Sequence, residues 1–451
     1  MPKITEGAGR RNAKLAAIPL GLAGRAVAGA GKRLAGKDKD EVQLELLEKT
    51  AEQLFDVLGE LKGGAMKVGQ ALSIYEAAIP EQFGEPFREA LTKLQAEAPP
   101  MPAKKVHQVL DQQLGTKWRD RFLDFNDEPA ASASIGQVHR ATWSDGRAVA
   151  VKVQYPGADH ALRADLKTLR RMGSLIEKLV PAADVKAMVD ELIDRTDDEL
   201  DYQSEANYQR QFAKAYADDP DFYIPKIIAS APKVVVSEWV DGIPLSKIIS
   251  AGTQAQRDDA AAKMSIFELS SPVRAGLLHG DPHPGNFRIM PDGRFAVLDF
   301  GAVGTYPDGL DPIIGKIFGL ARDEKYDELR AALEEGHFIP PDFHGRISTE
   351  EMVAFLGSYT EPLKYDEFHF TREWLQDMSN VSTDPDNVMQ GYKLVRNLNA
   401  PKEYVMLGRV LAGCVGIAAQ LEANIHYHDI AAAWIPGYCD EVKDPEYFPA
   451  A

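Results

Sequence analysis

The sequence predicts an α+β fold of two lobes, a strand-containing lobe followed by a mainly helical one, with a helical extension in front of both. Two alternating segments, 137–143 and 148–154, flank the turn Ser144–Arg147 and predict a β-hairpin in the first lobe. From Pro244 onward the pattern is mainly helical, except in the stretch 279–301. With 451 residues, 45% of them hydrophobic, the chain can bury the cores of two to three domains or of one large bilobal unit.

Four segments are predicted in order along the chain. They are a basic flexible arm (1–38), a helical extension (39–115), the first lobe (116–242) and the second lobe (243–451). Apolar residues at helical spacing predict extension helices at 40–62, 65–78 and 103–114, with a linker at Pro99–Pro102. In the first lobe we expect strands from about Phe122, at 137–143, 148–154 and Val234–Val236, and helices at 158–180 and 184–215.

Charge is distributed unevenly along the chain. The formal net charge is −17, and residues 1–37 alone carry +7, so the remainder carries −24. An acidic body lacks the basic footprint of a nucleic-acid binder. The basic arm favours a peripheral, anionic membrane surface as partner. A disordered solubilising tail and a cleaved targeting peptide are the alternatives for the arm.

Membrane spans and disulfides are not predicted. No stretch reaches the roughly 20 mostly apolar residues that cross a bilayer, and Leu411–Leu421 is strongly apolar but too short. The two cysteines, Cys414 and Cys439, make no disulfide framework and fit a reducing compartment. We therefore expect a cytoplasmic protein without a transmembrane segment, peripheral to a membrane if the arm binds one.

The stretch 279–301 carries the strongest chemical signal. It reads His279-Gly280-Asp281-Pro282-His283-Pro284-Gly285-Asn286 and then, after the strand Phe295–Leu298, Asp299-Phe300-Gly301. An Asp, four residues, an Asn and a later Asp-Phe-Gly is the spacing found in kinases. Asn286 and Asp299 offer the hard oxygen ligands that Mg²⁺ prefers, which leaves Asp281 to accept a proton or orient a nucleophile. A zinc site at His279 and His283 is a weaker interpretation, since no third soft ligand is near.

Lys152 stands in a strand of mainly β-branched residues. This fits the kinase lysine that contacts the α- and β-phosphates of ATP, and the alternative is a surface lysine at a strand edge. Such a lysine needs a carboxylate partner, for which Glu199 and Glu205 are the candidates. Six residues span roughly 240° around a helix, so these two carboxylates should have different partners. Which of them pairs with Lys152 stays open at this point.

The phosphate loop expected before Lys152 is poor in glycine. Pro129–His139 contains Ala131, Ser132, Ala133 and Ser134, and its one glycine is Gly136. Because alanine restricts positive φ, we expect this loop to be stiffer than a glycine-rich loop and to approach phosphates differently.

Taken in order, these motifs resemble the UbiB/AarF family of atypical protein-kinase-like ATPases, which is linked to ubiquinone biosynthesis. The match covers about residues 45–420 and includes Lys67-x-Gly69-Gln70, the alanine-rich segment ending Ile135-Gly136-Gln137-Val138-His139, Lys152, Glu199-x-Asp201 with Glu205, and the two catalytic motifs. The resemblance implies a bilobal protein-kinase-like fold, with Lys67 and Gln70 guarding the place where a protein substrate would sit.

The resemblance also implies roles for site residues. Asp281 would be the catalytic-loop acid, Asn286 and Asp299 the Mg²⁺ ligands, and Lys152 the partner of Glu199 or Glu205. ATP would also contact the alanine-rich segment Ala131–Ser134 and the hinge backbone from Glu238 to Val240.

The resemblance implies ATP and Mg²⁺ as cofactors and a lipid, isoprenoid or quinone-like partner. The predicted activity is that of an atypical kinase or ATPase. A protein kinase is one rival, against which the missing Ala-Pro-Glu segment counts. A nucleotide-sensing, lipid-binding chaperone with little turnover is the other, but such a protein could do without Asp281.

Overall fold

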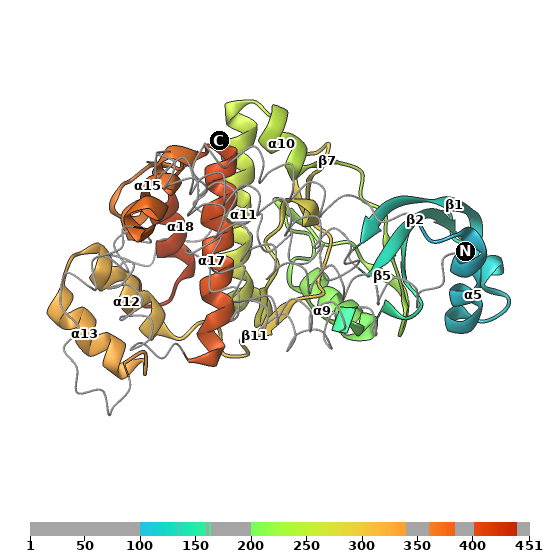
Figure 1. Cartoon of the computed structure of the whole chain (residues 1–451), viewed down its shortest axis with the longest axis horizontal. Helices are drawn as coiled ribbons and strands as arrows, with labels where there is room; N and C mark the ends of the chain where they lie inside the picture. The colour runs from blue at the N-terminus through green and yellow to red at the C-terminus, as the bar shows by residue number, and fades with distance from the viewer. Residues whose placement is uncertain are drawn as a thin grey trace, which may run out of the picture.

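The computed structural model describes residues 100–133, 135–158, 162–163, 200–339, 360–383 and 401–439. Lys67, Gln70, Ser134 and Glu199 lie outside the described residues, as does the whole predicted arm. In the described part, a strand-rich lobe and a mainly helical lobe lie end to end, with α9 (Tyr202–Ala215) between them (Figure 1). The α+β fold predicted from the sequence is confirmed.

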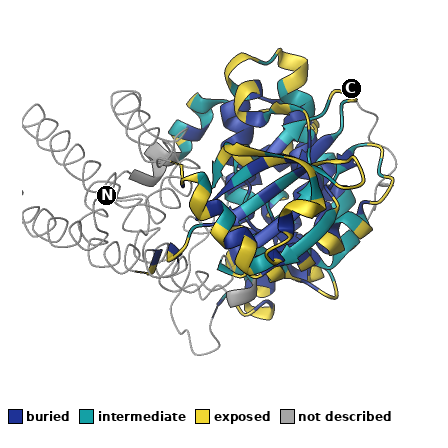
Figure 2. Cartoon of the chain, turned by 90° about the vertical axis from the view of Figure 1, so that its right-hand side faces the viewer, coloured by how far each residue is buried: buried dark blue, intermediate teal, exposed yellow. Residues whose placement is uncertain are grey.

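The first lobe is an antiparallel sheet covered on one face by a helix. Its strands follow the order β1 (Phe122–Ala133), β2 (Gly136–Trp143), β3 (Ala148–Gln154), β6 (Val234–Glu238) and β5 (Ile227–Ala231). The helix α5 (Ala103–Leu114) packs on this sheet and is followed by the short turn η2 (Trp118–Arg121), which leads into β1. Side chains alternate between the two faces of a strand, and every second residue of β3 faces α5. The residues on this face, Val149, Val151 and Val153, are fully buried. Lys152 therefore points from the opposite face. Figure 2 views this lobe, where buried and less buried residues alternate along the strands.

The second lobe is built around the helix α11. Its helices are α9 (Tyr202–Ala215), α10 (Leu245–Ala251), α11 (Gln254–Ala275), α12 (Pro312–Arg322), α13 (Tyr326–Glu335), α15 (Arg372–Thr383), α17 (Lys402–Leu421) and α18 (Tyr427–Trp434), with short turns η3 (Pro284–Asn286) and η4 (Glu361–Lys364). A capping box of Thr253 and Gln256 begins α11, and Gly276 at φ +65° ends it. Its buried face meets α17 and α18 in the main hydrophobic core.

Short strands in this lobe carry the loops of the site. They are β4 (Phe222–Tyr223), β7 (Ile243–Pro244), β9 (Phe287–Ile289) and β10 (Phe295–Val297) in one sheet, β8 (Leu277–His279) with β11 (Val303–Thr305), and β12 (Phe368–His369) with β13 (Asn424–Ile425). All pairs are antiparallel except β10 with β4.

The apolar helix near the C-terminus is longer than the sequence analysis expected. It begins at Lys402, nine residues before Leu411, and its window Tyr404–Leu421 is long and apolar enough to cross a membrane, with a mean hydropathy of 1.5. The expectation that no stretch meets this criterion was therefore wrong. In the structure 61% of that window is buried, and the helix packs against α11 and α15 in the core. Its apolar composition is accounted for by this packing.

The helix expected over 184–215 is interrupted at Asp201. This residue has φ −94° and ψ 84°, and its carboxylate accepts hydrogen bonds from the backbone N–H groups of Gln203 and Ser204. It is thus the N-cap of a new helix, α9. The 240° separation inferred for Glu199 and Glu205 assumed one continuous helix through Asp201, where the structure begins a new one; Glu199 itself lies outside the described residues.

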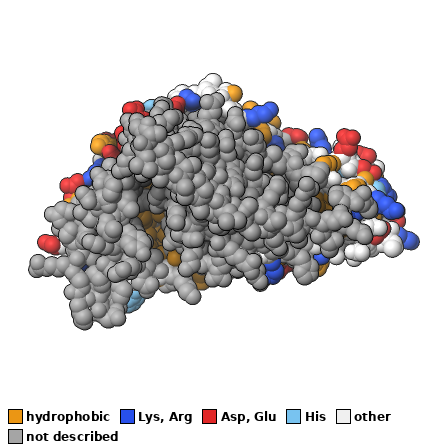
Figure 3. All heavy atoms as spheres, in the orientation of Figure 1, with side chains coloured by type: hydrophobic (Ala, Val, Ile, Leu, Met, Phe, Trp, Pro, Cys, Tyr) orange, Lys and Arg blue, Asp and Glu red, His pale blue; other side chains and the backbone are white. Residues whose placement is uncertain are grey.

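Charged side chains of both signs share the surface of the first lobe. At the right-hand end of Figure 3, lysine and arginine side chains lie beside aspartate and glutamate side chains. In the same lobe, in the turn between β2 and β3, Arg147 is paired with Asp145 at 2.7 Å.

Candidate active site

Two strand pairs bring the predicted catalytic motifs together. In the β9–β10 hairpin Phe287 lies opposite Val297, so the residues just outside it, Asn286 and Leu298, meet through a backbone hydrogen bond of 2.9 Å. In the second pair, β11 runs back along β8, and Gly280 N–H donates to Ala302 O at 2.8 Å. The loop that follows β8 and the turn that follows β10 are thereby held next to each other.

Lys152 links the two lobes through carboxylates. Its ammonium lies 2.6 Å from Glu205 Oε1 on α9 and 2.9 Å from Asp299 Oδ2 in the second lobe. Burial lowers the pKa of Lys152, but the charges of Asp299 and Glu205 outweigh it and hold the pKa well above its usual value. Lys152 is therefore a fixed cation, and Glu205 is the partner that the structure gives it.

The catalytic loop holds Asp281 and Asn286 together. The side-chain N–H₂ of Asn286 donates to Asp281 O at 2.9 Å and to Asp281 Oδ2 at 3.0 Å. His283 caps the intervening η3 turn by accepting from Gly285 N–H at 3.1 Å. Since the amide nitrogen of Asn286 is used in this way, its amide oxygen is the atom left to meet a ligand.

His279 is a buried connector and no metal ligand. Its Nδ1 lies 2.8 Å from Glu268 Oε1 on α11, and its Nε2–H donates to Asp299 O at 2.9 Å. Both side chains are fully buried. Burial lowers the pKa of His279, but the Glu268 carboxylate raises it above the usual value. Both ring nitrogens of His279 are used by these contacts, so it is not available to bind zinc. Within the described part of the chain no group of three metal-ligating side chains forms.

The helix α17 supports the catalytic loop from below. Arg409 donates a hydrogen bond to Gly280 O, and a Cβ at Gly413 would lie 2.6 Å from Cγ of Pro282. Met406 fills the space where a Cβ at Gly280 would come, at 3.0 Å. A side chain at Gly413 would therefore clash with Pro282, and one at Gly280 would crowd Met406, so the loop packs closely against α17.

The alanine-rich segment is mostly strand, which corrects the expectation of a loop. Ala131, Ser132 and Ala133 belong to β1 and pair with Val138, Gln137 and Gly136 of β2. β1 ends at Ala133 and β2 begins at Gly136, so the connection between the two strands is short. β-pairing uses an extended backbone with negative φ, so alanine and serine can stand in these strands and glycine is not required. The expected direct contact of these residues with ATP stays a prediction.

The expected hinge follows β6. Glu238 N–H and Trp239 N–H donate to Lys226 O and Ala148 O, each at 3.0 Å. The Glu238 carboxylate accepts from Tyr223 O–H at 2.8 Å and so faces β4, away from Lys152. Val240 is buried, and its backbone N–H forms no hydrogen bond with another described residue. The hinge from Glu238 to Val240 can therefore bind a nucleotide base through its backbone groups.

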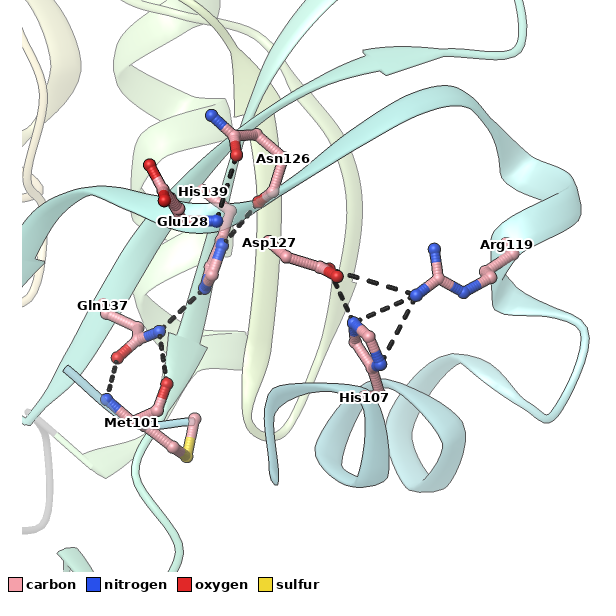
Figure 4. Close-up of polar contacts among 8 residues, drawn as sticks. All are labelled: Met101, His107, Arg119, Asn126, Asp127, Glu128, Gln137 and His139. Carbon is pink, nitrogen blue, oxygen red and sulfur yellow. Dashed lines mark hydrogen bonds and ion pairs between the residues drawn. The ribbon is translucent and has the colours of Figure 1, made fainter. Parts of the chain in front are cut away.

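A buried chain of hydrogen bonds ties the start of the described chain to β2 (Figure 4). Gln137 accepts from Met101 N–H at 2.7 Å and donates to His139 Nε2 at 2.9 Å. His139 Nδ1–H in turn donates to Asn126 O at 2.8 Å. Burial lowers the pKa of His139, which favours the neutral ring that this pattern requires. These hydrogen bonds anchor β2 just after Gly136, at the tip of the β1–β2 hairpin.

We expect Gln137→Leu to lower the free energy of unfolding by about 2–4 kcal/mol, because two buried groups, Met101 N–H and His139 Nε2, lose their partners. The neighbouring exposed cluster in Figure 4 supplies the control. There His107 lies 2.7 Å from Asp127, whose side chain is 49% exposed. Asp127→Asn should therefore cost less than about 1 kcal/mol. Urea unfolding followed by circular dichroism compares the two, and equal costs would contradict this ranking.

Some residues of this site carried no signal in the sequence. Glu268 and Arg409 reach the catalytic loop from 11 and 129 residues away, and no local spacing points to them. The segment Gln137–His139 was quoted for its motif, but its buried hydrogen bonds could not be read from it. Lys152 contacts Glu205 and Asp299, Asn286 contacts Asp281, and the two strand pairs hold these two sets next to each other. The roles that the sequence analysis gave these residues stay predictions.

Comparison with known proteins identifies the family. Residues 93–328 match the ABC1 atypical kinase-like domain. The protein ACTIVITY OF BC1 COMPLEX KINASE 3, chloroplastic, of Arabidopsis thaliana is 32% identical over 397 residues, 86% of this chain and 53% of the relative. The atypical kinase coq-8, mitochondrial, of Caenorhabditis elegans is 29% identical over 458 residues, 95% of this chain and 58% of the relative. The chain thus spans little more than half the length of these two curated relatives.

A solved structure is also similar. The complex of Rv3197 with erythromycin from Mycobacterium tuberculosis is 52% identical and matches with a TM-score of 0.66, over 90% of this chain and 100% of that chain. The family match extends over more than half of the chain and contains Lys152, Glu205, Asp281, Asn286 and Asp299. This chain therefore belongs to the ABC1 family of atypical kinase-like proteins, the UbiB family that the sequence motifs resemble.

Proposed function

We propose that this protein is an Mg-ATP-dependent atypical kinase or ATPase that supports quinone or isoprenoid-lipid metabolism at a membrane surface. The observation that carries the proposal is the pairing of Lys152 with both Glu205 and Asp299 beside a loop that presents Asp281 and Asn286. Phosphoryl transfer is catalysed mainly by positioning and by charge stabilisation. A fixed cation and three oxygen-bearing side chains supply both.

Each side chain has a role in this proposal. Lys152 binds the α- and β-phosphates of ATP while Glu205 holds its ammonium in place. Asp281 orients the attacking group or accepts its proton. The backbone of the hinge, with the buried N–H of Val240, binds the adenine base. The 2.9 Å contact of Lys152 with Asp299 ties the phosphate-binding cation to the metal-binding turn.

The donor set fits Mg²⁺. Asp299 presents a carboxylate that is 35% exposed, and the amide oxygen of Asn286 is left available by the hydrogen bonds of its nitrogen. Hard oxygen ligands of this kind suit a small, hard cation that completes its shell with phosphate and water. When bound, Mg²⁺ neutralises charge on the ATP phosphates. Asn286 and Asp299 are held at the same end of the β9–β10 hairpin, as shared ligands must be.

The relatives support a lipid-like or isoprenoid-like ligand. The coq-8 protein is named as an atypical kinase, and its family is linked to ubiquinone biosynthesis. Rv3197 was solved in complex with erythromycin. We extend to this chain the capacity to bind a large small molecule in addition to its nucleotide. The same ligand would also suit the alternative function, a nucleotide-sensing, lipid-binding chaperone with little turnover.

Release of ADP from Mg-ATP tests the proposed activity. The purified protein is assayed with and without liposomes containing anionic lipid, in the absence of any protein substrate. Turnover stimulated by the liposomes is the expected result. Absence of turnover in both conditions, with nucleotide binding intact, would favour the nucleotide-sensing chaperone. In a second assay a protein substrate is added. Phosphate transfer to that protein at a higher rate than to water would favour a protein kinase.

The basic arm is proposed to bind anionic membrane surfaces. Deleting residues 1–37 removes a net charge of +7. Because basic residues near an anionic surface contribute about 1 kcal/mol each, we expect the truncated protein to lose most of its co-sedimentation with phosphatidylserine liposomes. Neutral phosphatidylcholine liposomes are the control. If the truncated and full-length proteins sediment equally, the arm is only a solubilising tail.

A further inference from the structure

Tyr202 lies in the cleft beside the phosphate-binding lysine. It is the first residue of α9, one turn before Glu205. Its ring is fully buried, and the Lys152 ammonium stands 5.1 Å from the ring centroid, within the range of a cation–π contact. Tyr202 and Glu205 lie three residues apart on the same face of α9, so the ring and the Glu205 carboxylate both contact Lys152 from this helix. None of the roles proposed above uses the tyrosine hydroxyl.

The hydroxyl of Tyr202 is buried without a hydrogen-bond partner in the described part of the chain. It lies directly under Gly136, where a Cβ would come within 2.8 Å of it. Gly136 begins β2, two residues before Val138, which pairs with Lys152 across the sheet. Since residues two apart on a strand share a face, the hydroxyl lies on the face from which Lys152 points.

An unpaired buried hydroxyl destabilises a fold, and phenylalanine would fill the same space without that penalty. At the other end of α9, Tyr216 shows the usual solution, since its buried hydroxyl lies 2.9 Å from Ser270 Oγ. The Tyr202 hydroxyl therefore calls for a partner that the described part of the chain does not supply. That partner must be a hydrogen-bond acceptor that enters between Gly136, at the tip of the β1–β2 hairpin, and Lys152.

We propose that the Tyr202 hydroxyl is a further nucleotide-binding group, which donates a hydrogen bond to a phosphate oxygen of the bound nucleotide. The proposal rests on the proposed binding of Mg-ATP in this cleft. The Lys152 cation draws the phosphates to this point, and anionic oxygens are the strongest acceptors available. Burial raises the pKa of Tyr202, so the hydroxyl keeps its proton and acts as a donor.

The test compares Tyr202→Phe with Tyr216→Phe in the full-length protein. Isothermal titration calorimetry measures the affinity for Mg-ATP and for adenosine, and thermal unfolding without nucleotide measures stability. Tyr202→Phe should bind Mg-ATP about tenfold more weakly, bind adenosine as wild type does, and be at least as stable as wild type. Tyr216→Phe loses a satisfied hydrogen bond, so it should be less stable and bind both ligands normally.

Other outcomes overturn the proposal in distinguishable ways. If wild type binds Mg-ATP and Tyr202→Phe binds it equally well, the hydroxyl has no role in phosphate binding, while the proposed function stands. If Tyr202→Phe weakens adenosine and Mg-ATP to the same degree, the effect is on the fold and not on the phosphates. If wild type itself binds no Mg-ATP, the proposed function fails and this inference fails with it.

Discussion

Asp299→Asn is expected to weaken the binding of Mg-ATP about 100-fold, which corresponds to about 3 kcal/mol. The substitution removes a negative charge from the turn that would hold the metal, and loss of one partner of a desolvated charge pair costs on this scale. The amide keeps the size of the side chain, and Lys152 keeps Glu205 as its partner at 2.6 Å. The fold should therefore survive the change.

Thermal shift with a nucleotide titration measures this effect. Without Mg²⁺ the variant should bind ATP at least as tightly as wild type does, because the change removes a negative charge near the phosphates and leaves Lys152 in place beside Glu205. Asp292→Asn is the matched control, since it makes the same change on the same β9–β10 hairpin, at a carboxylate that pairs with Arg294 at its exposed turn. Equal stabilisation of wild type and Asp299→Asn by Mg-ATP would rule out Asp299 as a metal ligand.

Asp281→Asn should lower ATP turnover by about 10²- to 10⁴-fold while leaving the affinity for Mg-ATP within about twofold of wild type. General acid–base or orienting groups contribute on this scale to the chemical step. In the structure Asp281 binds Asn286 and not Lys152, so its role separates from phosphate binding. The loop backbone is held independently by Arg409 and by Ala302 O.

Steady-state ADP release and calorimetry are the two measurements for Asp281→Asn. Asp311→Asn serves as the control, because Asp311 is the N-cap of α12 and asparagine caps helices equally well. That variant loses the same charge in the same lobe and should turn over ATP normally. Should Asp281→Asn retain full turnover, the reaction would have to proceed without this carboxylate.

Local patterns in the sequence predicted the elements that local physics decides. The hairpin at Ser144–Arg147, the helix 103–114 and the strand at Val234–Val236 all appear in the structure. Each depends on periodicity or turn residues within about ten positions. The motif spacing likewise predicted that Lys152, Asp281 and Asp299 share a site.

What the sequence could not show was decided by distant contacts or by competing local effects. Asp201 looked like one more charge on a long helix, but its carboxylate caps the backbone and starts α9. The choice of Glu205 for Lys152 depends on where α9 sits against the sheet, which no spacing gives. Glu268 and Arg409 support the catalytic loop through packing between elements. The alanine-rich segment joined β1 because small side chains fit a tight hairpin as well as a loop.

The most direct test of this account is a crystal structure of the full-length protein with Mg²⁺ and a non-hydrolysable ATP analogue. The account predicts Mg²⁺ at about 2.0–2.1 Å from oxygens of Asn286 and Asp299, with the ammonium of Lys152 on the phosphates and the base at the Val240 backbone. A nucleotide bound elsewhere, or a metal held without Asp299, would contradict the central claim that this cleft is an Mg-ATP site.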